Sequence, residues 1–185
     1  MPGDERENFF TELLKFALIA ILIVVPVRLY VAQPFIVSGA SMAPTFETGE
    51  YLIVDELSYH LGDPERLDVI IFRYPKNPEE FFIKRIIGLP GETVRIAGDS
   101  ITITTTGGEE IELAEPYIKN PGNGGYLERT LGADEYFVLG DNRRESSDSR
   151  FWGELPRENI IGRAFLRLLP LKHIGIFPGA ISIQQ

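Results

Sequence analysis

The chain has 185 residues, of which 44% are hydrophobic, and a formal net charge of -9. This length permits one well-packed soluble domain and no second full domain, and the negative charge argues against nucleic acid as a partner. The absence of cysteine excludes disulfides, cysteine-bound zinc and a thiol nucleophile. His60 and His173 do not form a spaced metal-binding pair, so neither a metal nor a cofactor is predicted.

An apolar segment follows a short polar tail at residues 1–8. Its uninterrupted apolar run, residues 16–27, is shorter than the roughly 20 residues that a membrane-spanning helix needs. We therefore predict one transmembrane anchor helix over 9–33, in which the long side chains of Lys15 and Arg28 reach toward opposite membrane surfaces.

The alternative for this segment is a secretory leader that is cleaved off, because Ser38-Gly39-Ala40 satisfies a small-x-small cleavage rule. The leading residues are acidic, however, and the small triplet lies well beyond the apolar run. Both features favour an uncleaved anchor, while the charges around the segment leave its orientation open.

A constrained loop with a serine comes next. Gly39 can enter backbone conformations closed to other residues, and Pro44 fixes its own φ and biases Ala43 toward extended geometry. Ser41 is therefore held on a loop. A serine hydroxyl becomes a nucleophile when a nearby base takes its proton, and without such a base Ser41 is an ordinary turn serine.

The remaining sequence, residues 34–185, has the pattern of a mainly β domain with antiparallel sheets. Turn residues between 88 and 113 indicate a β-meander, and residues 119–125 have the composition of an exposed loop. The predicted strands are 51–54, 69–72, 81–87, 93–96, 101–105, 111–113, 136–139 and 162–169.

Lys84 is the candidate base. Strand alternation places Phe82, Lys84 and Ile86 on one face, so the lysine head lies among apolar groups. Burial disfavours the ammonium and lowers the pKa of a lysine from about 10.4 toward neutrality, as a general base requires. On spacing alone, an edge-strand lysine that blocks sheet association is the stronger interpretation.

Three segments in chain order change that balance. They are Ser41-Met42-Ala43-Pro44-Thr45 after Gly39, then Lys84-Arg85-Ile86-Ile87-Gly88-Leu89-Pro90-Gly91-Glu92, then Gly140-Asp141-Asn142-Arg143 with Ser146, Asp148, Ser149 and Arg150. With the preceding apolar segment, they resemble the type I signal peptidases, a family of membrane-bound Ser-Lys proteases. The resemblance extends from the anchor to about residue 164.

The resemblance implies a serine endopeptidase in which Ser41 is the nucleophile and Lys84 the general base, acting through an acyl-enzyme. The backbone N–H of Ser41 would serve the oxyanion hole. Some relatives add a serine side chain at the position of Gly39, so the second donor is left open here.

The same resemblance assigns supporting roles behind the catalytic pair. The Ser146 hydroxyl would orient the lysine, and Asp148 would be a structural ion-pair partner of Arg85 or Arg150.

The implied substrates are exported preproteins, bound extended beside a strand and cut after small residues at positions -3 and -1. The implied location is the plasma membrane, with a single pass and the catalytic domain on the extracytoplasmic side. Signal peptides and the lipid bilayer would be the partners. The residues expected to line the substrate pockets are Phe35, Val37, Met42, Phe82 and Ile83.

Two alternatives are weighed against this hypothesis. A self-cleaving repressor shares the Ser-Lys chemistry, but an apolar N-terminal segment in place of a DNA-binding domain argues against it. A membrane-tethered β-domain could bind exported peptides without cutting them, which an unreactive Ser41 would favour.

Overall fold

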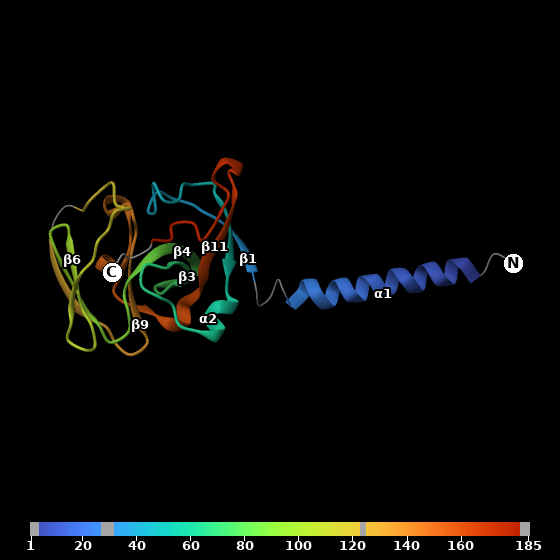
Figure 1. The fold of residues 1–185 in the computed structure, drawn as a ribbon, viewed down its shortest axis with the longest axis horizontal. Helices are drawn as coiled ribbons and strands as arrows, with labels where there is room; N and C mark the ends of the chain where they lie inside the picture. Colours follow the sequence, from blue (N-terminus) through green and yellow to red (C-terminus); the bar gives the residue numbers. More distant parts are fainter. Residues whose placement is uncertain (1–3, 27–31, 123–124, 182–185) are drawn as a thin grey trace.

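Two antiparallel sheets form the body of the protein, and a long helix leads into them (Figure 1). The computed structural model describes residues 4–26, 32–122 and 125–181. The larger sheet has eight strands and the smaller has four. This arrangement confirms the predicted mainly β, antiparallel fold class.

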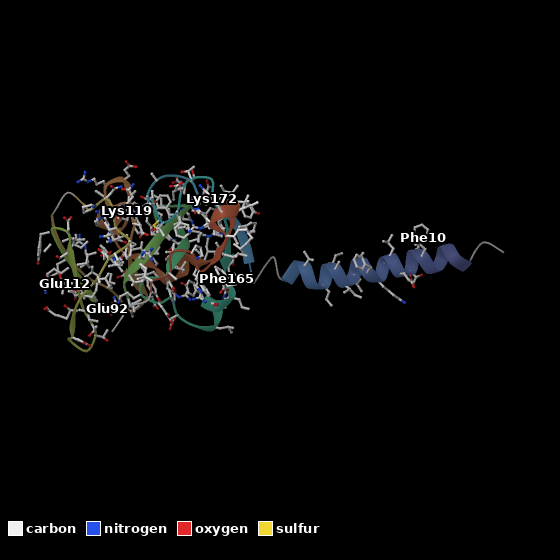
Figure 2. The ribbon with its side chains drawn as sticks, turned by 45° about the horizontal axis from the view of Figure 1, so that its top comes forward. Phe10, Glu92, Glu112, Lys119, Phe165 and Lys172 are labelled. Carbon is white, nitrogen blue, oxygen red and sulfur yellow. The ribbon has the colours of Figure 1, made fainter. Side chains whose placement is uncertain are left out.

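Helix α1 (Asp4–Pro26) extends away from the sheets with its apolar side chains exposed, as Figure 2 shows for Phe10. Within the described residues, no helix combines the length and the apolar character needed to cross a bilayer. The transmembrane helix predicted over 9–33 is therefore not supported. Charged Glu12 and Lys15 interrupt the apolar sequence of α1, and residues 27–31 of the predicted span lie outside the described part.

The larger sheet has the strand order β1-β2-β11-β3-β4-β9-β10, with β12 paired to β11. Its strands are β1 (Ala32–Ile36), β2 (Tyr51–Asp55), β3 (Val69–Tyr74), β4 (Asn77–Gly88), β9 (Glu135–Leu139), β10 (Leu155–Pro156), β11 (Ile160–Leu169) and β12 (Gly175–Ile176). The short helices around it are α2 (Leu57–Leu61), η2 (Arg143–Glu145), α3 (Ser149–Trp152), η3 (Arg157–Asn159) and η4 (Leu171–His173).

The smaller sheet has the order β7-β6-β5-β8. Its strands are β5 (Thr93–Ala97), β6 (Ser100–Thr104), β7 (Glu110–Glu112) and β8 (Tyr126–Thr130). The predicted meander is confirmed for the three consecutive strands β5, β6 and β7. Residues 123–124 of the predicted loop at 119–125 lie outside the described part.

Strands β1 and β4 both leave part of one edge open within the described chain. Strand β1 pairs only with β2, and β9 pairs with β4 only from Arg85 onward. The sheet curls so that these two edges approach each other. The rings of Phe35 on β1 and Phe81 on β4, for example, lie 5.5 Å apart. Buried Val37, Leu52 and Ile71 belong to the hydrophobic cluster beneath this gap.

Candidate active site

The loop that carries Ser41 is fixed from below and from one side. Met42 and Phe46 are buried in the hydrophobic cluster under the loop. The backbone N–H of Asn142 donates to the Ser41 carbonyl at 3.0 Å, and the Asn142 side-chain amide donates to the Ala40 carbonyl at 3.1 Å. These anchors place Ser41 at a defined position, so its hydroxyl can meet a partner without a large ordering cost.

That partner is Lys84. Its Nζ lies 2.7 Å from the Ser41 Oγ and donates to the Ile83 carbonyl at 2.8 Å. The lysine is only 3% exposed. Burial lowers the pKa of Lys84 to about 8, against the opposing effect of the Asp148 and Asp141 carboxylates. The structure thus brings the predicted nucleophile and base into direct contact.

The next residue on β4, Arg85, ties the lysine strand to the serine loop. It is fully buried, and it donates to both carboxylate oxygens of Asp141, at 2.9 and 2.6 Å. The Thr45 hydroxyl, four residues after Ser41, donates to the same carboxylate at 2.6 Å. One carboxylate therefore holds the base strand and the nucleophile loop together.

Asp148 belongs to a second ion pair. It is fully buried and accepts from the Arg150 guanidinium at 2.8 Å and from the Gly140 backbone N–H at 3.1 Å. Of the two alternative partners, Asp148 pairs with Arg150 and not with Arg85. Arg85 pairs with Asp141 because Asp141 follows β9, the strand whose Leu139 is in register with Arg85.

The Ser146 hydroxyl does not contact Lys84 in the way that was predicted. It is buried and has no hydrogen-bond partner among the described residues. It packs against Gly140, where an added Cβ would lie 2.2 Å from the Ser146 Oγ and 2.4 Å from the Ser41 carbonyl oxygen.

A cleft of about 420 Å³ opens in front of Ser41 and Lys84. Four of the five predicted pocket residues line it, namely Phe35, Val37, Phe82 and Ile83. The fifth, Met42, does not line it and is 1% exposed, because its side chain anchors the serine loop in the core. Gly39 lines the cleft with a φ of +93°, and a Cβ there would point into open space.

Several residues of the site could not be assigned from the sequence. Asp141, Asn142 and Thr45 lie within the recognised motifs, but only the folded chain shows that they bond to the serine loop and to Arg85. Leu52 and Ile71 contribute to the cleft floor from strands distant in sequence. The available indication is the position of Asp141, two residues after the apolar end of strand β9.

The arrangement can perform acyl transfer. A desolvated lysine can accept the proton of a hydroxyl 2.7 Å away. The Ser41 backbone N–H has no acceptor among the described residues, so it can donate to a developing oxyanion in the cleft. Across residues 4–26, 32–122 and 125–181, no cluster of three or more acidic or histidine side chains suited to a metal ion occurs.

Comparisons with known proteins find a family of peptidases. Residues 10–169 match the family model described as signal peptidase, peptidase S26. A signal peptidase I from Leptolyngbya laminosa is 41% identical over 164 residues, covering 85% of this chain and 78% of the relative. A probable signal peptidase I-2 from Synechocystis is 38% identical over 175 residues, covering 92% and 78%. A solved signal peptidase I from Enterococcus faecalis is 33% identical, covers 55% of this chain and 97% of its own, and has a TM-score of 0.47.

The close packing around Gly140 predicts that Gly140→Ala lowers the free energy of unfolding by about 1–3 kcal/mol, because its Cβ would collide with the Ser41 carbonyl and the Ser146 side chain. Gly62→Ala is the matched control, since its Cβ would meet only one atom, at 3.6 Å. Chemical denaturation of both variants measures the difference. Equal stability of the two would contradict this account of the Gly140 contacts.

Proposed function

Because the chain belongs to the signal peptidase family, peptidase S26, we propose that Ser41 and Lys84 carry out its reaction. Its activity is that of a signal peptidase, a serine endopeptidase that removes signal peptides from preproteins. The observation that supports the assignment is the 2.7 Å contact between the Ser41 hydroxyl and an amine buried to 3% exposure. Among the described residues that line the cleft, no other pair places a side-chain hydroxyl beside a buried amine.

The proposed reaction begins when the neutral amine of Lys84 takes the Ser41 proton. The Ser41 Oγ attacks the scissile carbonyl, and the resulting tetrahedral intermediate collapses to an acyl-enzyme as the lysine ammonium protonates the leaving amine. The lysine, neutral again, activates a water that attacks the ester. The mature protein leaves after the first step and the signal peptide after the second.

The oxyanion would be stabilised by the Ser41 backbone N–H. Gly39 offers no side-chain donor, and its own backbone N–H donates to the Thr48 hydroxyl at 3.1 Å. The role of Ser146 in orienting the lysine stays a proposal. Its hydroxyl is buried and has no hydrogen-bond partner among the described residues, which costs about 1–3 kcal/mol, and a hydrogen bond with Lys84 would remove that cost.

The substrate would lie extended between the open edges of β1 and β4 and complete their hydrogen bonding. Small side chains at -1 and -3 would point to the cleft floor formed by Val37, Leu52 and Ile71. On β4, Ile83 packs on that same cluster. The rings of Phe35 and Phe81, which both line the cleft, meet further along it.

We further propose that α1 attaches the chain to the plasma membrane, with the β domain on the extracytoplasmic side. Large apolar side chains around α1, such as Phe16, Leu18 and Leu22, are each more than 60% exposed. Such a surface is costly in water and favourable in a bilayer. Holding enzyme and preprotein at the same membrane would raise their effective concentration.

Cleavage by single variants tests the catalytic pair. Ser41→Ala and Lys84→Ala should each lower kcat for a preprotein with Ala-x-Ala before the cut by at least about 1000-fold. Each removes one member of a catalytic pair whose two groups act together. Exposed Ser100→Ala and Lys76→Ala are the matched controls and should retain full activity. Product formation is followed by mass spectrometry, and a variant at 41 or 84 that still cleaves would remove that residue from the mechanism.

Fractionation tests the membrane attachment. The full chain should remain in the membrane pellet after carbonate extraction, whereas a chain lacking residues 1–31 should move to the supernatant, since it loses the apolar surface of α1. Immunoblotting of both fractions measures the distribution. Full release of the intact chain by carbonate would contradict the proposal.

A further inference from the structure

The catalytic cleft has an uneven charge distribution. Of the residues that line it, only Glu80, Lys84 and Glu145 are charged. Lys84 is buried and already engaged with Ser41, whereas both glutamates are exposed. Among the described residues, neither glutamate has an ion-pair partner. A bound peptide would therefore meet uncompensated negative charge.

Glu80 has the better defined position of the two. Its Oε1 accepts a hydrogen bond from the Asn77 side-chain amide at 2.8 Å, which orients the carboxylate. From Phe81 to Lys84, strand β4 stays in unbroken register with β3. At about 3.3 Å per residue, Glu80 thus lies about 13 Å along the strand from Lys84.

Strand alternation relates Glu80 to one position of the substrate. Ile83 packs on the cluster under the cleft, and Phe81 shares its face, while Phe82 faces the other way. Glu80 comes directly before Phe81, where the register between β3 and β4 shifts, and it lines the cleft together with Phe81 and Phe82. We take the substrate to run parallel to β4, with its -1 side chain on the floor level with Ile83, beside Ser41 and Lys84, and its -3 side chain level with Phe81. Its -2 and -4 side chains then lie on the opposite face, level with Phe82 and Glu80.

We propose that Glu80 makes this cleft select preproteins with a lysine or arginine at position -4 and disfavour those with an acidic residue there. This inference rests on the proposed peptidase function, because it uses the same cleft with the residues before the cut lying toward Glu80. The preference is electrostatic. An exposed ion pair between Glu80 and a basic side chain at -4 contributes modestly to binding and is screened by salt.

The test compares three peptide substrates that share Ala at -1 and -3 and carry Lys, Gln or Glu at -4. With the full chain in detergent at low salt, kcat/KM should fall from Lys to Gln to Glu, by about three- to tenfold in total. Glu80→Gln should reduce this ratio to less than about twofold. High salt should do the same for the wild type.

Glu79→Gln is the matched control. It removes the same charge from the neighbouring residue, whose side chain does not line the cleft. It should keep the full Lys-to-Glu ratio. Equal rates for the three peptides with wild type, or a ratio unchanged in Glu80→Gln, would overturn the inference and leave the peptidase intact. Failure of the wild type to cleave any of the three would overturn the peptidase function instead.

Discussion

The structure depends on keeping one amine out of water while carboxylates lie nearby. Burial favours the neutral form of Lys84, whereas Asp148 and Asp141 favour the ammonium. Each of these carboxylates is engaged by a guanidinium, Asp148 by Arg150 and Asp141 by Arg85. The two arginines therefore reduce the negative field at the lysine, and burial remains the larger effect.

The same ion pairs fix the geometry of the reaction. Asp141 binds Arg85 of the lysine strand and Thr45 of the serine loop, and the adjacent Asn142 donates to the carbonyls of Ala40 and Ser41 in that loop. The three recognised motifs thus meet at one point. Removing either member of the buried Arg85 and Asp141 pair would leave an uncompensated charge, which usually costs more than the pair contributes.

Sequence reasoning identified the residues whose chemistry is distinctive in local context. Ser41 on a constrained loop and Lys84 in an apolar strand could be paired because the motifs resemble a known family, and the structure brings them together. Long-range choices were beyond reach. Which aspartate pairs with Arg85 depends on the register of β4 and β9, and the burial of Met42 depends on how the loop docks.

Some elements were missed for local reasons. Strand β1 contains Pro34, which is tolerated there because β1 lies at the edge of the sheet. Strand β8 has mostly exposed side chains and so lacks an apolar alternation. The helix α1 was expected from its composition, but composition alone does not establish a membrane span.

Direct titration of Lys84 tests the central claim. The Nζ chemical shift is followed by NMR from pH 6 to 11 in the nitrogen-labelled chain, and the resonance is assigned by its loss in Lys84→Gln. We predict a midpoint near pH 8, well below the value of about 10.4 for exposed lysines. The fraction of Lys84 in its neutral form then increases as pH rises through 8, and the rate of cleavage should increase with it. A midpoint that coincides with those of the exposed lysines would contradict a desolvated lysine base.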